Sequence, residues 1–225
     1  MFVTDAYKTA GEINTAMAKV YQNMALAVLN SMVVSYLVSV SPGLMAFFFT
    51  GIMKWIVIFA PLAAIFAVSF MLNEKTTKGT ALGLLHGFAA LMGLSFASIF
   101  VVFQMGSIVS AFMGAAILFG TMSFYGYFTK KDLTSMGQFM FVGLIAIIIA
   151  SIVNIFVGST VFQMVISALA IVIFLGLTAY DTQKIREIVS YGQSNHVEEI
   201  RGALTLYLDF INIFLSLLQL FGDRK

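Results

Sequence analysis

The distribution of charged side chains constrains this chain more than any other feature. Apart from His86, four long stretches contain no side chain that is charged near neutral pH: residues 20–53, 55–73, 79–129 and 133–180. A fifth stretch, 202–222, contains only Asp209. A membrane-spanning helix needs about 20 predominantly apolar residues, so the pattern predicts an all-α membrane protein with several spans.

Composition excludes other classes of protein. Only 10% of the 225 residues are charged, whereas a soluble domain carries about 25%, which argues against a soluble enzyme or a disordered chain. The net charge of +2 provides no basic surface for nucleic acid. The absence of cysteine excludes disulfides and thiol catalysis.

The lengths of the apolar runs predict the number of spans. Residues 79–129 and 133–180 are each too long for one helix, and we expect them to fold back at 104–107 and 157–160. Residues 1–19 then form a short cytoplasmic arm before a single domain, 20–225. The prediction is a bundle of seven transmembrane helices at roughly 20–40, 55–72, 80–102, 107–127, 137–157, 161–181 and 203–221. The polar stretch 181–202 extends the sixth span into the cytoplasm.

Lysine and arginine positions predict the orientation of these spans. If the N-terminus is cytoplasmic, nine of these residues lie on the inner side and only Lys54, Arg224 and Lys225 on the outer side. The nine are Lys8, Lys19, Lys75, Lys78, Lys130, Lys131, Lys184, Arg186 and Arg201. Because cytoplasmic loops carry an excess of positive charge, we expect the N-terminus in the cytoplasm.

Asp209 is the one residue of the stretch 202–222 that is charged near neutral pH. A charge near the middle of a span costs roughly 2.5–3.5 kcal/mol on insertion scales, so such a residue generally faces the bundle interior and has a function. Polar residues spaced by three or four positions share its helix face: Thr205, Asn212, Ser216, Gln219 and Asp223. This stripe predicts a central or pore-lining last helix, although Ser, Thr, Asn and Gln side chains also join helices by hydrogen bonds.

Asp181 ends the predicted sixth span, and the seventh enters from the same side of the membrane. Adjacent antiparallel helices would bring Asp181 and Asp209 together, although Asp181 alone also reads as an ordinary solvated charge at a helix end. Two carboxylates in a site of low dielectric constant cannot both ionise easily, so they retain one proton between them. Such a pair can sense pH, and with nearby carbonyl oxygens it suits Ca²⁺.

The two histidines have less specific interpretations. His86 lies beside Gly79, Gly83 and Gly87, whose spacing allows helices to approach closely. A neutral, packed histidine is the first interpretation of His86, and a proton relay is the second. His196 lies in the polar stretch, where we expect it to be solvated.

Two motifs identify a family resemblance. Residues 176–183, Gly-Leu-Thr-Ala-Tyr-Asp-Thr-Gln, and 203–212, Ala-Leu-Thr-Leu-Tyr-Leu-Asp-Phe-Ile-Asn, resemble the transmembrane Bax-inhibitor-motif family, in particular its bacterial branch. The resemblance implies a seven-helix bundle with the last helix in the middle, located in the bacterial inner membrane. It also implies that Asp181 and Asp209 sense pH and gate a slow Ca²⁺ leak. Some members have a basic residue near the end of the second span that engages the pair, and Lys75 is the nearest counterpart here.

Three functional hypotheses follow. The first is a pH-sensitive Ca²⁺ or cation leak channel that is not an enzyme, has no cofactor and holds Ca²⁺ at Asp181 and Asp209. The second is a non-catalytic regulator that binds a membrane-bound quality-control protease, a partner that the resemblance implies, or a stress-response protein. The third is an intramembrane aspartyl protease, which is disfavoured because Asp209 lacks a Gly-x-Gly-Asp context and the chain has no Pro-Ala-Leu element. Membrane lipid, Ca²⁺ and protons are the expected partners, and the sequence leaves the oligomeric state open.

Overall fold

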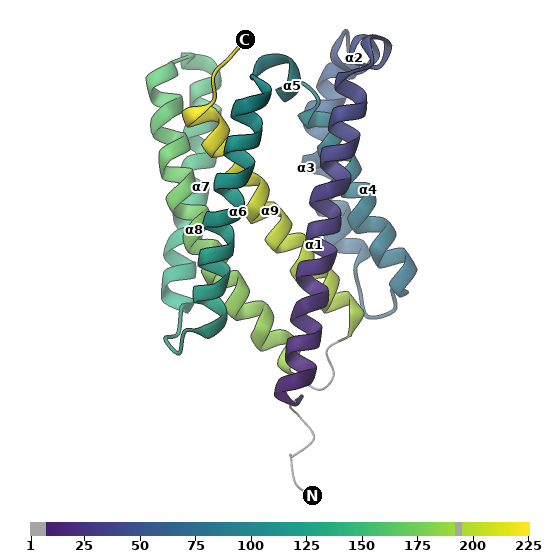
Figure 1. Cartoon of the computed structure of the whole chain (residues 1–225), viewed down its shortest axis with the longest axis vertical. Coiled ribbons are helices and arrows are strands. Elements are labelled where there is room, and N and C mark those ends of the chain that lie inside the picture. Colours follow the sequence, from purple (N-terminus) through teal and green to yellow (C-terminus); the bar gives the residue numbers. More distant parts are fainter. Residues whose placement is uncertain (1–7, 192–194) are drawn as a thin grey trace, which may run out of the picture. The chain divides into compact units, whose positions relative to one another are not determined.

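The computed structural model describes residues 8–191 and 195–225, and these residues form helices without a strand (Figure 1). The helices are α1 (Ala10–Ser39), α2 (Pro42–Phe49), α3 (Met53–Met71), α4 (Lys78–Phe96), α5 (Ile99–Val102), α6 (Met105–Phe128), α7 (Thr134–Val157), α8 (Thr160–Ser190) and α9 (His196–Phe221). The all-α prediction is therefore confirmed for the described part of the chain.

Six of the described helical segments are long and apolar enough to cross a membrane, or seven if the bent pair α1 and α2 counts as one span. The chain is thus an integral membrane protein. The breaks between helices lie at or beside both predicted fold-back points, at residues 103–104 before α6 and at residues 158–159 before α8. Gly158, which follows α7, has a φ of +66°, a left-handed conformation that glycine adopts without steric cost and that commonly ends helices.

Several predicted boundaries were wrong. The first helix begins at Ala10 rather than at residue 20, because Thr9 and Glu12 form a capping box that satisfies backbone N–H groups at its start. The predicted third span, 80–102, agrees with the candidate span Lys78–Val102, within which the helix is broken near Ala97 between α4 and α5. The last helix begins at His196, seven residues before the predicted start at 203, because helical structure continues through polar residues that hydropathy alone assigns to a loop.

The chain divides into two compact units. One comprises the described part of Met1–Gln104 together with Val189–Tyr207 and Arg224–Lys225, and the other comprises Met105–Ile188 and Leu208–Asp223. The long helices α8 and α9 each contribute residues to both units.

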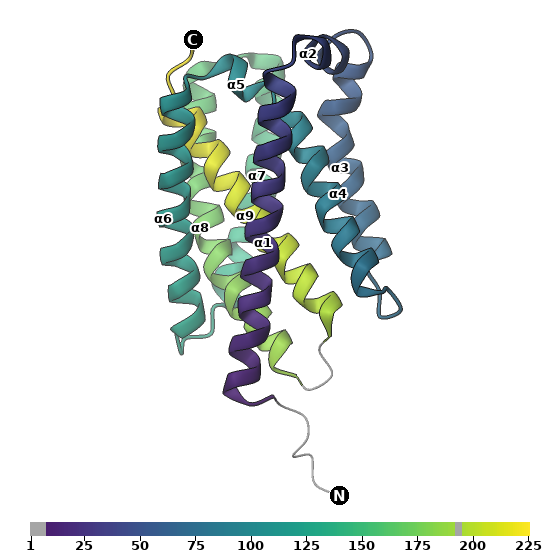
Figure 2. The same ribbon diagram turned by 45° about the vertical axis from the view of Figure 1, so that its right-hand side comes forward.

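In the first unit, α1 packs against α4 (Figure 2). Gly93 permits the close approach, since a Cβ atom there would collide with the backbone of Ser31. The Ser31 hydroxyl lies 2.7 Å from the carbonyl oxygen of Ala89 and 2.7 Å from the hydroxyl of Tyr207, which is fully buried. These hydrogen bonds join α1, α4 and the first half of α9.

The predicted glycine ladder does not form this contact. A Cβ atom at Gly79, Gly83 or Gly87 would meet no atom within 4 Å, so that face of α4 is open within the chain. The prediction of close packing at this ladder was therefore wrong, and the close packing occurs about one and a half turns beyond Gly87, at Gly93.

Candidate functional site

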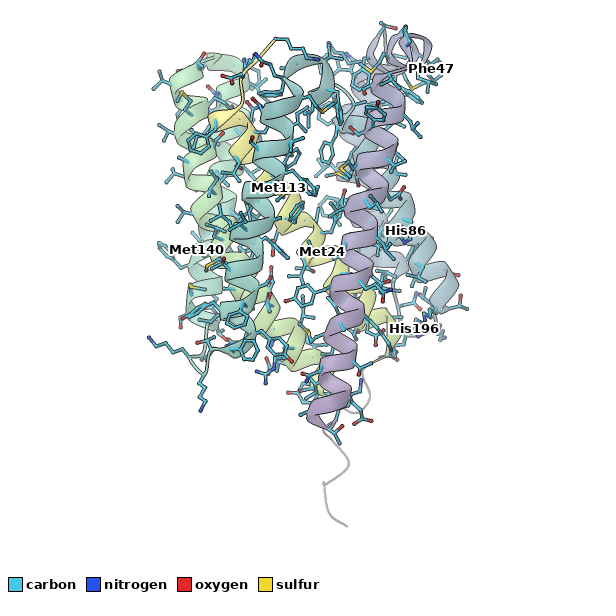
Figure 3. All side chains as sticks on the ribbon, in the orientation of Figure 1. Met24, Phe47, His86, Met113, Met140 and His196 are labelled. Atoms are coloured by element: carbon cyan, nitrogen blue, oxygen red, sulfur yellow. The ribbon has the colours of Figure 1, made fainter. Side chains whose placement is uncertain are left out.

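The segment of α8 that carries Asp181 packs closely against α6 and α7 in the second unit. Gly126 of α6 lies against the backbone of Ala179, and Gly137 of α7 lies against the ring of Tyr180. In both places a Cβ atom would overlap atoms of α8. Figure 3 labels Met140 of α7, whose side chain fills the space beside Gly176. Small residues thus allow three close contacts within one and a half turns of α8.

Hydrogen bonds restrict movement of the same segment along the axis of α8. The Thr182 hydroxyl lies 3.3 Å from the hydroxyl of Ser123 on α6. The Gln183 amide donates to the carbonyl oxygen of Lys131 at 2.8 Å and accepts from the backbone N–H of Leu133 at 2.9 Å. Because the two residues that follow it are bonded to α6 and to the α6–α7 connection, Asp181 has little freedom to move along the helix axis.

Aromatic packing positions Asp209 on α9. The Phe210 ring makes edge contacts with Phe112 and Phe119 of α6, and Phe214 contacts Phe112 in the same way. Edge-to-face pairs of this kind each contribute about 0.5–1.5 kcal/mol beyond burial. They fix the rotation of the second half of α9 relative to α6, within the same unit.

The carboxyl groups of Asp181 and Asp209 are hydrogen-bonded to each other. Asp209 is only 4% exposed, whereas Asp181 is half-buried. The second oxygen of Asp209, Oδ2, is buried and has no hydrogen-bond partner among the described residues. The site therefore brings two carboxyl groups together and leaves one buried acceptor oxygen without a donor among the described residues.

Two other members of the predicted stripe bond to their own helix, whereas the backbone N–H of Asp223 donates to the hydroxyl of Ser107 on α6 at 3.0 Å. The Thr205 hydroxyl donates to the carbonyl oxygen of Arg201 at 3.1 Å, and the Asn212 amide donates to that of Leu208 at 2.8 Å. Thr205, Asn212 and Ser216 are half-buried, and Gln219 is exposed. Neither of these two bonds joins α9 to another helix, so a role as interhelical glue receives no support from them.

The remaining candidate residues lie in the first unit. His86 is half-buried on α4, and its backbone carbonyl accepts a hydrogen bond from the Asn30 amide at 2.8 Å. Its ring makes no hydrogen bond with the described residues, so nothing connects it to a relay there. Lys75 is exposed, and its backbone N–H bonds to the side chain of Asn73. Its ammonium group has no hydrogen bond or ion pair within the described ranges.

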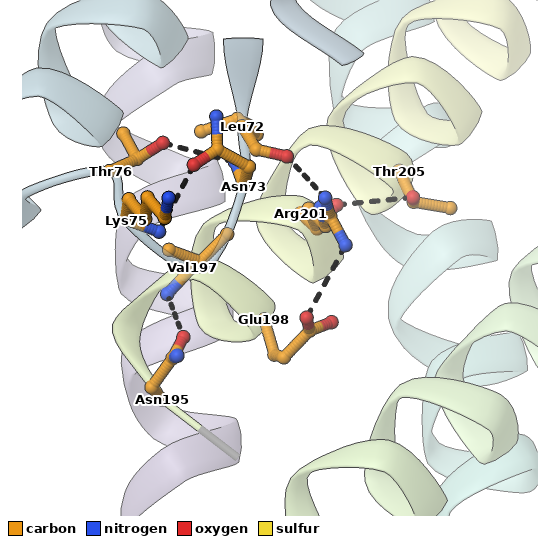
Figure 4. Close-up of polar contacts among 9 residues, drawn as sticks. All are labelled: Leu72, Asn73, Lys75, Thr76, Asn195, Val197, Glu198, Arg201 and Thr205. Carbon is orange, nitrogen blue, oxygen red and sulfur yellow. Dashed lines mark hydrogen bonds and ion pairs between the residues drawn. The ribbon is translucent and has the colours of Figure 1, made fainter. Parts of the chain in front are cut away.

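A different basic residue contacts the connection that contains Lys75. Arg201 donates to the carbonyl oxygen of Leu72 and forms an ion pair with Glu198 at 3.3 Å (Figure 4). His196, which was expected to be solvated, is half-buried, and its Nε2 atom lies 2.9 Å from the carbonyl oxygen of Thr76. These two bonds hold the α3–α4 connection to the start of α9. Hydropathy could not predict these bonds, because their acceptors are backbone carbonyl groups, which every residue has.

The described residues offer few side chains that could bind a metal ion together. They contain no cluster of three or more His, Cys, Asp or Glu side chains that could hold a metal ion. Asp181 and Asp209 provide two carboxyl groups, whereas Ca²⁺ takes six to eight oxygen ligands. Backbone carbonyl oxygens or water would have to supply the others.

Comparison with known proteins identifies the family. Residues 13–225 match the family described as "Inhibitor of apoptosis-promoting Bax1". The inner membrane protein YbhL of Escherichia coli is 39% identical over 95% of this chain and 93% of its own length. Uncharacterized proteins of Rickettsia prowazekii and Borreliella burgdorferi are 40% and 41% identical, over 99% and 94% of this chain and 95% and 93% of their own lengths. The match covers both aspartate motifs and every described helix except the first residues of α1, and the chain therefore belongs to the Bax inhibitor family.

Proposed function

We propose that this protein is a pH-sensitive leak channel for Ca²⁺ or related cations, gated by Asp181 and Asp209, and that it catalyses no reaction. The observation that carries the proposal is the hydrogen bond between the two carboxyl groups, combined with the burial of Asp209 and its unpartnered oxygen. Ionisable residues are rare in membrane helices because they are costly there, and they commonly mark ion or proton pathways.

The proton shared by the pair links pH to the state of the site. When the proton leaves, two negative charges lie side by side in surroundings of low dielectric constant, where they repel each other strongly. The repulsion is relieved if the side chains separate or if a cation enters between them. Ca²⁺ and H⁺ therefore compete for the pair, and Ca²⁺ binding becomes stronger as the pH rises.

The small number of carboxylates supports passage of Ca²⁺ rather than its storage. An ion that must leave a conducting site has to be held weakly, and a pair of carboxyl groups without a third acidic neighbour in the described residues fits that requirement. The half-buried polar side chains of Thr205, Asn212 and Ser216 on the same face of α9 would line the route.

In the proposed arrangement α9 is the central helix of a seven-span bundle. Its first half bonds to α1 through Tyr207 and Ser31, and to the α3–α4 connection through Arg201 and His196. Its second half contacts α6 and α8. The excess of lysine and arginine in the inner segments favours a cytoplasmic N-terminus, and the YbhL relative favours the bacterial inner membrane.

Purified protein in liposomes that contain a Ca²⁺-sensitive dye tests the proposal. We expect a Ca²⁺ influx that changes with pH, and we expect Asp209→Asn and Asp181→Asn each to remove most of the pH dependence. Glu74→Gln is the control, because Glu74 is an exposed carboxylate in the connection between α3 and α4. Flux that is absent from the unsubstituted protein, or that keeps its pH dependence in both variants, would contradict the proposal.

A further inference from the structure

The helix α2 is apolar on every side and has no buried residue. Its sequence is Pro-Gly-Leu-Met-Ala-Phe-Phe-Phe, and Leu44 and Phe47 are among its exposed side chains. Figure 3 shows Phe47 in α2, at the end of α1 that lies away from residue 10. A helix that is hydrophobic all round is normally buried in protein or lipid, so the surface of α2 requires a cover that the rest of the described chain does not provide.

The angle between α1 and α2 favours a position of α2 at the edge of the hydrocarbon core of the bilayer. Its axis makes an angle of 101° with that of α1, so if α1 crosses the membrane, α2 runs nearly parallel to the membrane plane. Gly51, with a φ of +57°, then reverses the chain into α3. An eight-residue helix leaves most of its terminal N–H and C=O groups without helical partners, which keeps it near water rather than in the centre of the bilayer.

The residues that follow α2 also indicate a position at the membrane–water boundary. Trp55 is 55% exposed in the first turn of α3, and the ammonium group of Lys54 lies 5.1 Å from the centre of its ring. Tryptophan is enriched where the membrane meets water, and lysine extends its charge toward the headgroups from that position. Lysine is also depleted in protein–protein interfaces. The pair therefore favours lipid over a second protein as the cover for α2.

We propose that α2 lies in the boundary between phospholipid headgroups and acyl chains, in the leaflet opposite the N-terminus, and that it anchors the connection between α1 and α3 there. The site binds the bilayer itself, with Leu44 and Phe47 among the acyl chains and Lys54 at the lipid phosphates. It is separate from the aspartate pair, and the inference does not depend on the proposed channel activity.

The single tryptophan of the chain makes the test direct. The full protein is reconstituted in phosphatidylcholine–phosphatidylglycerol vesicles whose lipids carry bromine either near the headgroup or near the bilayer centre. Three proteins are compared: the unsubstituted chain, Phe47→Trp in a Trp55→Phe background, and Leu62→Trp in the same background as a control in the middle of α3. Leu62 is 59% exposed, so it serves as a lipid-facing reference at greater depth.

We expect the indole groups at positions 55 and 47 to be quenched at least about twofold more by bromine near the headgroup than by bromine near the centre, since interfacial helices lie at a shallow depth. The control should show the opposite order. Leu44→Trp in the Trp55→Phe background replaces the Phe47 variant if that protein does not fold. Stronger quenching at position 47 by central bromine would indicate a re-entrant helix and overturn the proposal. If neither brominated lipid quenches the indole at position 47, and quenching appears when the protein is diluted in excess lipid, a second copy of the chain covers α2. That result would overturn the proposal as well.

Discussion

Asp181 on α8 and Asp209 on α9 form a hydrogen-bonded carboxyl pair, and 27 positions of sequence that contain a helix end, a polar connection and a helix start lie between them. The pair forms because each partner is held separately. Close contacts with α6 and α7 fix the α8 segment, and aromatic packing against α6 fixes the second half of α9.

The close contact between α6 and α8 predicts a strong effect of a small substitution. Gly126→Ala places a methyl group against the backbone of Ala179, which cannot move away as a flexible side chain would. We expect a loss of about 1–3 kcal/mol in the free energy of unfolding, the usual cost of overpacking. Gly120→Ala, on the same helix, meets no atom within 4 Å and should be neutral or slightly stabilising. Thermal unfolding in detergent measures both, and equal effects would contradict the role of Gly126.

The hydrogen bond between Tyr207 and Ser31 predicts a moderate effect in the first unit. Tyr207→Phe removes the hydroxyl but keeps the ring and its edge contact with Phe88. Interhelical hydrogen bonds in membrane proteins contribute about 0.6 kcal/mol on average, so we expect a loss of that order. Unfolding of the single variants Tyr207→Phe and Ser31→Ala, and of the double variant, isolates the pair. Strictly additive effects would show that the two hydroxyls do not interact.

The attachment of the α3–α4 connection depends on Arg201 rather than on Lys75. Arg201→Gln removes the bond to the carbonyl oxygen of Leu72 and the ion pair with Glu198. We expect faster amide hydrogen exchange over residues 72–77 in this variant and no change in Lys75→Gln, since the Lys75 side chain is exposed. If Lys75→Gln also accelerates exchange there, Lys75 holds the connection through a contact absent from this structure.

Much of this architecture could be predicted from hydropathy. The run lengths identified the fold-back points near 104 and 158, because each apolar run is much longer than the stretch of about 20 residues that crosses the membrane once. The run lengths did not locate the start of the first or of the last helix. Both α1 and α9 start earlier than predicted, because capping at Thr9 and helix-forming residues after His196 extend them through polar sequence. Hydropathy also treated α2 as part of a loop, since it is too short to span.

The aspartate pair could be predicted for a related reason. A charge in an apolar run is conspicuous, and helical spacing together with chain direction was sufficient to suggest that Asp209 meets Asp181. The residues that hold the pair could not be found in this way. Gly126 and Gly137 resemble the other glycines of the sequence, and their importance comes from partners more than 40 residues away in α8. The contacts of Arg201 and His196 with backbone carbonyl groups were missed because such acceptors exist at every residue.

Asp132 provides a prediction about pH outside the membrane-spanning segments. Hydrogen bonds from the hydroxyl and then from the backbone N–H of Thr134 lower the pKa of Asp132. A lowered folded-state pKa means that the ionised form stabilises the fold above the unfolded-state pKa, and that this contribution is lost as the pH falls through the folded-state pKa. We therefore expect Asp132→Asn to be less stable than the unsubstituted protein near neutral pH and equally stable in acid.

Thr134→Ala separates the two hydrogen bonds of Asp132. It removes the hydroxyl donor and leaves the backbone N–H, which lies 2.8 Å from the carboxylate, so its effect should be smaller than that of Asp132→Asn at neutral pH. Thermal unfolding over a pH series measures this order. A difference between Asp132→Asn and the unsubstituted protein that persists unchanged in acid would show that the carboxylate charge is not responsible.

Ca²⁺ flux into liposomes, measured as a function of pH, is compared between the unsubstituted protein, Asp209→Asn and the control Glu74→Gln, in which an exposed carboxylate of the α3–α4 connection is replaced. An amide cannot ionise, so the variant at position 209 retains a hydrogen-bonding group but loses the exchangeable proton. We predict that flux through the unsubstituted protein and the control changes severalfold between about pH 5 and about pH 8, and that flux through Asp209→Asn is nearly constant. A pH dependence that is the same in all three proteins would contradict the account of Asp181 and Asp209 as the gate.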